Sequence, residues 1–167
     1  MTAKADFTAA EWERLLEAPV IAGMVISMSS PSLLGSIGES MAIAKTFAAS
    51  LQQAVGNELL TAMLADFQNK ETAQVAKPHF DTKDPAQLKQ EMASRLQIAV
   101  DLLNQKATPE EGQAIRQWLY QVATNVATAT KEGGFLSIGA VRVSDAEKAA
   151  LTELAGIFGV EATLPTE

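Results

Sequence analysis

The sequence predicts an all-α protein, organised as a single-domain bundle of about six helices over residues 1–167. Three observations support this prediction. Apolar residues recur at intervals of three and four through most of the chain, and three segments have the form of helix capping boxes. In addition, residues 18–38 carry no charge in a chain that is 20% charged. With 167 residues, of which 47% are hydrophobic, the chain is long enough to bury a substantial core.

The uncharged segment 18–38 is expected to lie at the centre of the bundle. Its apolar residues are so closely spaced that a helix through them is apolar on nearly every side, and such a helix must be enclosed. The unbroken apolar run covers only residues 18–26, whereas a membrane span needs about 20 predominantly apolar residues. We therefore expect enclosure by protein and no stable membrane insertion.

The first helix is predicted to begin at Thr8, because Thr8 and Glu11 have the spacing of a capping box. Pro19 lacks an amide hydrogen and is expected to bend the helix. The apolar side of the segment before the bend consists of Trp12, Leu15, Leu16 and Val20.

Two further helices are predicted in the first half of the chain. One covers about residues 32–55, after a Ser-Pro turn, and ends at Gly56. The next begins at Asn57, whose side chain can cap it. Its predicted buried residues are Leu59, Leu60, Met63, Leu64 and Phe67. Residues 69–85 are polar and contain two prolines, so they are expected to form the longest connection.

The second half of the chain is predicted to contain three helices. One runs from Asp84-Pro85 to about Lys106, and a second follows the capping sequence at Thr108. Residues 133–134, both glycine, end the second helix, and residues 135–143 are predicted to form a compact apolar loop. A capping box at Ser144 begins the last helix, and residues 161–167 are expected to be frayed.

A weak internal similarity suggests two pseudo-similar halves. Trp12 and Trp118 each lie early in a helix that becomes small and apolar. Each is followed by a Ser-Ile-Gly sequence, at residues 36–38 and 137–139.

Composition excludes several classes of function. The chain has no cysteine, which excludes disulfides, thiolate metal sites and a cysteine nucleophile. A net charge of -7 opposes binding to a phosphate backbone, so nucleic acid is not an expected partner. The opening residues lack the basic-then-apolar order of a secretory signal, and a cytoplasmic location is expected.

Residues 131–159, together with residues 11–12 and 16–19, resemble a family of small uncharacterised bacterial all-helical proteins. The Ser144–Glu147 start and the following Leu-x-x-Leu-Ala pattern also resemble, more distantly, one hairpin of the tellurite-resistance TerB-like domains. This resemblance implies an all-α fold, a stress-related role and acidic, metal-binding sites. Where the TerB-like turn usually carries Asp-Gly, this chain has Ile138-Gly139-Ala140, so a carboxylate is missing.

Candidate metal ligands are Glu13 and Glu17, which share one face of the first helix. They could hold a divalent cation if a neighbouring helix supplied another carboxylate. Favourable charge near the helix start explains most such acidic residues without a metal. His79 is the only histidine, so an ordinary zinc site is excluded. Asp81 and Asp84 could assist it as a base, although a solvated connection is the simpler interpretation.

These patterns favour binding over catalysis, and no cofactor is expected. Our hypothesis is a non-enzymatic cytoplasmic scaffold or interaction protein, stress-related, with a protein partner or self-association as a homodimer. The alternatives are a small-molecule or lipid carrier with a cavity between the Met24 helix and loop 135–143, peripheral membrane association through that loop, a weak divalent-metal-binding TerB-like protein, and an enzyme. The predicted ligand or partner surface consists of Met24, Met28, Phe135, Leu136 and Ile138.

Overall fold

The computed structural model describes residues 1–29, 50, 54, 56–69, 71–72, 76–129 and 143–165. This part of the chain is helical and contains no strand, so the all-α prediction is confirmed for it. Its elements are a 3₁₀ turn η1 (Lys4–Asp6) and helices α1 (Ala9–Ser29), α3 (Glu58–Gln68), α5 (Pro85–Lys106), α6 (Pro109–Ala129) and α7 (Asp145–Phe158). The predicted helix over 32–55, except Ser50 and Ala54, and both Ser-Ile-Gly sequences lie outside the described residues.

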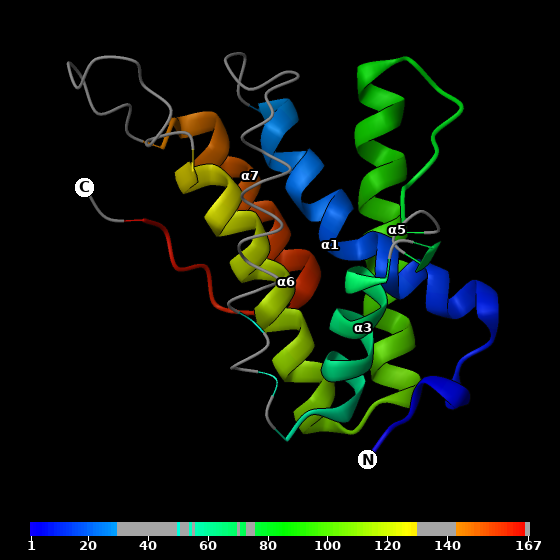
Figure 1. Cartoon of the computed structure of the whole chain (residues 1–167). Coiled ribbons are helices and arrows are strands. Elements are labelled where there is room, and N and C mark those ends of the chain that lie inside the picture. Colours follow the sequence, from blue (N-terminus) through cyan, green and yellow to red (C-terminus); the bar gives the residue numbers. More distant parts are fainter. Residues whose placement is uncertain are drawn as a thin grey trace.

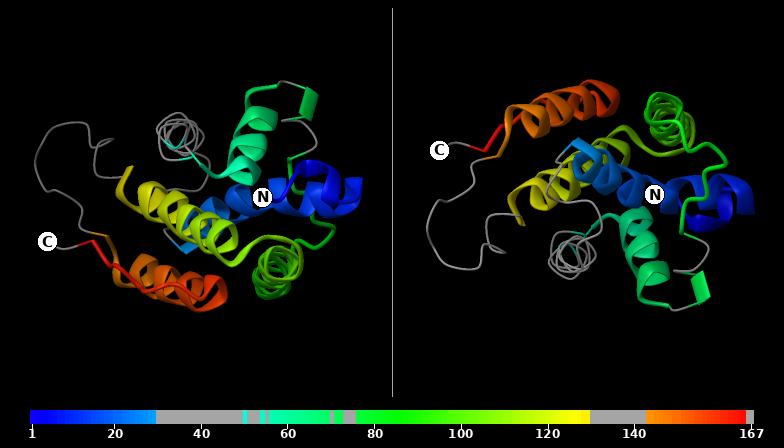
Figure 2. Two further views of the ribbon diagram at one scale, coloured as in Figure 1. Left: turned by 90° about the horizontal axis from the view of Figure 1, so that it is seen from below. Right: turned by 90° about the horizontal axis from the view of Figure 1, so that it is seen from above.

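Helix α1 occupies the centre of the described bundle, as its composition predicted. It packs against α3, α5, α6 and α7 (Figure 1). Figure 2 shows α1 passing between α3 on one side and α5 and α7 on the other. The central position follows from the sequence of α1, because a helix that is apolar on most sides is stable in water only when neighbouring helices cover it.

Pro19 lies inside α1, and the helix continues through it. In a helix the carbonyl oxygen of Leu15 would normally accept a hydrogen bond from the amide of residue 19. Because proline has no amide hydrogen, this bond cannot form. Figure 1 shows that the first and second parts of α1 run in different directions, which agrees with the predicted bend.

The predicted helix starts are confirmed by their capping hydrogen bonds. The side chains of Asn57, Asp84 and Ser144 each accept a hydrogen bond from the backbone amide three residues later. Full capping boxes form at three helix starts, where the side-chain hydroxyl and the glutamate carboxylate each bond the other residue's amide. These pairs are Thr8 with Glu11, Thr108 with Glu111, and Ser144 with Glu147.

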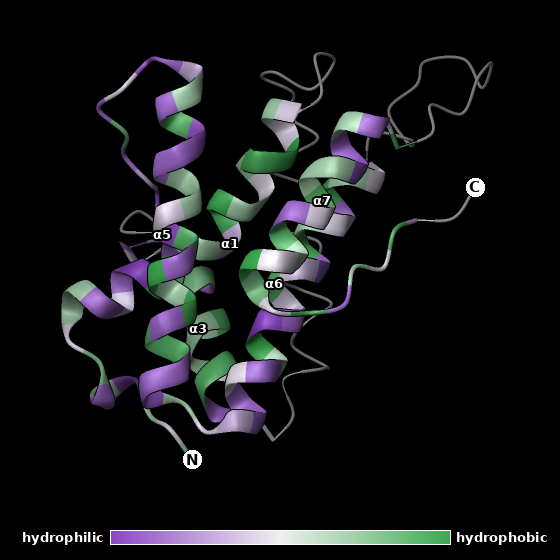
Figure 3. Cartoon of the chain, turned by 180° about the vertical axis from the view of Figure 1, so that it is seen from behind, coloured by the Kyte–Doolittle hydropathy of each residue, from purple (hydrophilic) through white to green (hydrophobic). Residues whose placement is uncertain are grey.

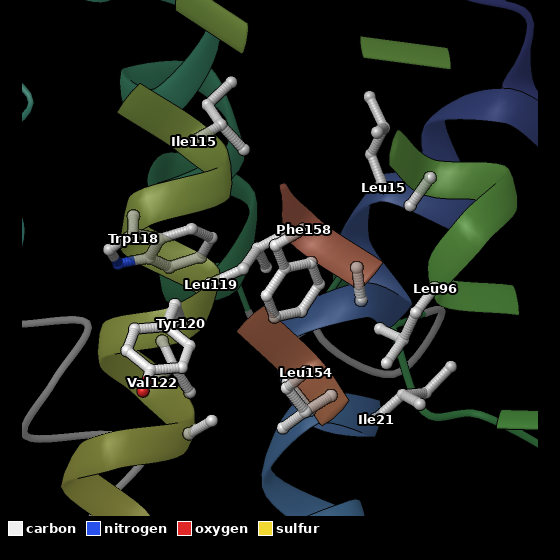
Figure 4. Close-up of a cluster of buried hydrophobic side chains, with 14 of the residues drawn as sticks. Leu15, Ile21, Leu96, Ile115, Trp118, Leu119, Tyr120, Val122, Leu154 and Phe158 are labelled. Carbon is white, nitrogen blue, oxygen red and sulfur yellow. The ribbon is translucent and has the colours of Figure 1, made fainter. Parts of the chain in front are cut away.

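The core is formed by facing apolar sides of α1, α5, α6 and α7. Phe158 is fully buried near the end of α7, and Figure 4 shows its ring between the α6 side chains and those of α1 and α5. The side chains labelled on the side of α6 include Trp118, Leu119 and Val122, and those labelled on the other side are Leu15, Ile21 and Leu96. Helix α7, which carries this ring, packs against α6, α1 and α5.

The residues before α1 and the first turn of α1 are held against the bundle by polar contacts, an arrangement that the sequence did not predict. Lys4 Nζ lies 2.6 Å from Asp66 Oδ2 of α3, and the same oxygen accepts a 2.6 Å hydrogen bond from Trp12 Nε1. Lys106, at the end of α5, forms a 2.6 Å ion pair with Glu11. We call these contacts, together with that of Thr2 to Glu111 described next, the N-terminal clamp.

Glu111 accepts most of its hydrogen bonds from backbone amides. The Thr2 nitrogen lies 3.1 and 3.2 Å from the two carboxylate oxygens, and the Thr108 amide donates to Oε2 at 3.2 Å. Burial raises the pKa of Glu111, but the hydrogen bonds from Thr2 and Thr108 outweigh burial and hold its pKa below the usual 4.5. The carboxylate is therefore the form that the folded chain favours.

Beyond α7 the chain takes no regular secondary structure over residues 161–165. Gly159 ends α7 in the left-handed conformation, with φ of 62°, which glycine adopts without strain. The Tyr120 hydroxyl donates a 3.3 Å hydrogen bond to the carbonyl of Thr163. This bond connects the segment to α6.

Replacing Phe158 by alanine is expected to lower the free energy of unfolding by about 3–5 kcal/mol, because the substitution leaves a cavity among four helices. Ile98→Ala on α5 is the matched control, since Ile98 is 43% exposed and its loss should cost less than about 1 kcal/mol. Urea denaturation followed by circular dichroism measures both. Equal losses in the two variants would contradict the assignment of Phe158 to the core.

Glu111→Gln is expected to lower the free energy of unfolding at pH 7 by about 1–3 kcal/mol, since it removes a charged acceptor of hydrogen bonds. The pKa of Glu111 is lowered by folding, so its contribution is present above pH 4.5 and is lost as the pH falls through the folded-state pKa. The variant and the parent chain should therefore converge in urea titrations at acidic pH. Glu110→Gln, on the exposed side of the same turn, is the control. A difference that stays constant with pH would contradict this role.

Candidate functional site

The best candidate for a functional surface is a row of three apolar side chains on α1, Val20, Met24 and Met28, which we call the apolar stripe. All three are partly exposed, although most neighbouring residues of α1 are buried. They are spaced four residues apart and so lie on one side of the helix. Residues 18–29 carry no charge, and Figure 3 shows the second part of α1 as largely apolar. Met24 and Met28 pack against the core with part of their surface.

An ion-pair network around one buried carboxylate lies one helical turn before the apolar stripe. Glu17 is only 3% exposed, and its carboxylate lies 2.6 Å from Arg14 Nη1 of the same helix. Arg95 Nη1 of α5 approaches the same carboxylate at 3.4 Å. Two guanidinium groups therefore compensate the one buried charge, which otherwise would be costly to remove from water. We call Glu17, Arg14, Arg95 and Glu91 the Glu17 network.

Arg95 connects three parts of the chain. Its Nη2 donates to Glu91 Oε1 at 2.6 Å and to the backbone carbonyl of His79 at 2.7 Å. Its guanidinium carbon lies 4.5 Å from the centre of the Phe80 ring, the geometry of a cation–π contact. The connection before α5 is therefore attached to both α5 and α1. Because Glu17 precedes Val20 by three residues, its contact with Arg95 places the start of the apolar stripe toward α5.

The predicted metal ligands occupy different environments. Glu13 is partly exposed, whereas Glu17 is buried and engaged by two arginines. Among the residues that the structure describes, no group of three or more acidic or histidine side chains could hold a metal ion. The chemistry available at Glu17 is charge compensation, because cations of the chain itself already contact both carboxylate oxygens.

His79 and its acidic neighbours lie at the surface. The His79 Nε2 atom is 3.2 Å from Asp81 Oδ1, but their side chains are 87% and 100% exposed. Asp84 serves instead as the N-cap of α5, where it accepts a hydrogen bond from the Gln87 amide. Solvent screens such an exposed pair, so this arrangement supplies a solvated connection and a helix cap.

Only part of the predicted partner surface can be placed. Met24 and Met28 lie on α1 as part of the apolar stripe. The other predicted members, Phe135, Leu136 and Ile138, lie outside the described residues.

Sequence reasoning did not identify the Glu17–Arg95 contact, which joins residues 78 positions apart. One signal was available, since Glu91 and Arg95 have the spacing of an ion pair on one helix side. Nothing in the local pattern indicated that Glu17 would be buried against α5. The helical spacing places Glu17 on the polar face with Glu11, Glu13 and Arg14, and this expectation is wrong for Glu17, which is buried.

Arg95→Met is expected to lower the free energy of unfolding by about 3–5 kcal/mol, because it leaves Glu17 buried with weaker charge compensation. Adding Glu17→Gln to this variant should restore part of the loss. The two single variants and the double variant form a thermodynamic cycle, measured by urea denaturation. Lys89→Met, which removes a surface ion pair with Glu153, is the control and should cost less than about 1 kcal/mol. Strict additivity of the two single substitutions would contradict a direct Glu17–Arg95 interaction.

No helix in the described ranges combines the length and the apolar character that a membrane crossing requires. Comparisons of the chain with protein-family models, curated proteins and solved structures found no match.

Proposed function

We propose that this chain is a non-enzymatic helical scaffold or interaction protein, and that the apolar stripe of α1 is part of its contact surface. The observation that carries this proposal is the partial exposure of Val20, Met24 and Met28 on the central helix. Burial of that remaining apolar surface by a partner would gain about 25 cal/mol for each Å² removed from water. A cytoplasmic location, and the stress-related setting that the TerB-like resemblance implies, belong to the same proposal.

The buried acidic residues support binding over catalysis. Glu17 is engaged by two arginines, and Glu111 by backbone amides at the N-terminal clamp. Glu147, the third buried carboxylate of the described residues, accepts a hydrogen bond from the Ser144 amide at the start of α7. All three carboxylates therefore have structural roles. A general base would need a carboxylate that can accept a proton from a substrate.

The chemistry of the apolar stripe restricts the partner surface. A charged group placed against it would lose water without gaining an opposite charge on residues 18–29. The partner face is therefore expected to be apolar, as on an amphipathic helix of another protein or of a second copy of this chain. Methionine side chains suit such contacts because they are unbranched and adapt to different shapes.

The double variant Met24→Gln, Met28→Gln is expected to weaken association by at least about tenfold, equivalent to 1.4 kcal/mol. Sedimentation velocity over a range of concentrations measures self-association, and quantitative pull-down measures binding to another protein. Ile98→Gln is the matched control, because it changes an exposed apolar residue on α5. Circular dichroism confirms that the variants retain the fold.

A parent chain that is monomeric at every concentration and retains no partner in the pull-down would overturn the proposal. Native mass spectrometry of the same preparation tests the carrier alternative. A small molecule retained by the parent chain and lost from the double variant would assign the apolar stripe to ligand binding instead.

A further inference from the structure

The methionines in the described helices have two kinds of environment. Met63 of α3 and Met92 of α5 are 0% and 1% exposed and belong to the core. Met24 and Met28 of α1 are partly exposed, and only part of their surface packs against that core. They lie on successive turns of one helix side, because four residues separate them. A small solute in water can therefore reach these two methionines of the apolar stripe more readily than the two in the core.

The thioether sulfur of methionine can be oxidised, unlike the side chain of valine or leucine. When hydrogen peroxide is the oxidant, the sulfur lone pair forms a bond to one peroxide oxygen, the O–O bond breaks, and the other oxygen leaves as water with both hydrogens. The product is methionine sulfoxide, whose S–O group is polar, whereas the thioether is only a weak acceptor of hydrogen bonds. Oxidation thus makes an apolar side chain polar without changing its charge.

The second part of α1 has no free side-chain donor for such a group. Residues 18–29 carry no charge, and the only hydroxyl groups among them belong to Ser27 and Ser29. Both hydroxyls donate a hydrogen bond to the backbone carbonyl four residues earlier, at 3.1 and 2.9 Å. A sulfoxide oxygen in the apolar stripe would therefore depend on water for its hydrogen bonds from this segment's surroundings. Burying it beneath an apolar partner would remove that water at a cost in free energy.

We propose that Met24 and Met28 are a peroxide-sensitive modification site, and that their conversion to sulfoxides releases a partner from the apolar stripe. The inference rests on the proposed function, because the stripe must bind a partner for its oxidation to have this effect. Hydrogen peroxide is uncharged, so the net charge of -7 does not keep it from the surface. Enzymatic reduction returns the thioether, with the oxygen leaving as water, so the modification is reversible.

The first experiment measures the order of oxidation. The full chain, diluted below the concentration at which it associates, is treated with hydrogen peroxide, and peptide mass spectrometry follows the gain of oxygen at each methionine. Met24 and Met28 are expected to react at least about tenfold faster than Met63 and Met92, because access to the sulfur limits the reaction. Equal rates at these positions would overturn the proposal. The measurement needs no partner and is independent of the proposed function.

The second experiment compares association before and after peroxide treatment, by sedimentation velocity and quantitative pull-down. Oxidation is expected to weaken association at least about tenfold, as the double Gln variant does. Methionine sulfoxide reductases of both stereospecificities, with dithiothreitol as the reductant, should restore it. Association that is unchanged after complete oxidation of Met24 and Met28 would overturn this inference and leave the proposed function standing. An untreated chain that does not associate would overturn the proposed function, and this inference with it.

Two double variants locate the effect. Met24→Leu with Met28→Leu removes the sulfur atoms from the stripe and keeps it apolar, so peroxide should cause no change relative to the same variant untreated. The variant retains every other methionine, including Met1, which is 83% exposed, so an effect of oxidation elsewhere would still be seen in it. Met63→Leu with Met92→Leu is the matched control and should keep the full response to peroxide.

A response to peroxide that persists without the stripe sulfurs, or that disappears without the core sulfurs, would overturn the assignment to Met24 and Met28. Circular dichroism of the oxidised chain distinguishes loss of the partner from loss of the fold. The helical signal is expected to remain, because the modified side chains are partly exposed. Unfolding that accompanies the weaker association would overturn a specific effect on the apolar stripe.

Discussion

The structure depends on the enclosure of α1, whose second part has no charged residue and too little polar surface to face water alone. Four helices cover it, and each presents an apolar side to it. The interaction is non-directional, so by itself it would allow several arrangements of the same helices. The bend at Pro19 reduces the number of possible helix arrangements. The two parts of α1 run in different directions and present different surfaces to the surrounding helices.

Directional polar contacts select one arrangement from those that the core allows. The N-terminal clamp joins the start of the chain to α3, α5 and α6, and the Glu17 network joins α1 to α5 and to the preceding connection. Both sets place carboxylates in low-exposure positions, where an unmatched charge would be destabilising. Alternative packings that separate these partners are thereby disfavoured. The polar contacts therefore give the apolar core its specificity.

The apolar core and the polar contacts also matter for the function that we propose. A surface that binds a partner must keep some apolar area available, whereas the stability of the bundle favours burying it. In the function that we propose, α1 would meet both requirements, because most of its side chains are buried and the apolar stripe is partly exposed. The Glu17 network fixes the helix directly beside this stripe, so a partner would meet a surface already held in position. Such preorganisation lowers the entropy lost on binding.

The sequence determined the helical class, the main helix starts and the central place of α1, because capping and apolar periodicity are local properties that a few neighbouring residues express. Asn57, Asp84, Thr108 and Ser144 act as predicted for this reason. It also indicated Met24 and Met28 as surface candidates. Only the tertiary structure brought Glu17 to Arg95 and Thr2 to Glu111, since these partners are 78 and 109 positions apart. Each of these residues has an unremarkable local pattern, and its burial depends on how whole helices pack.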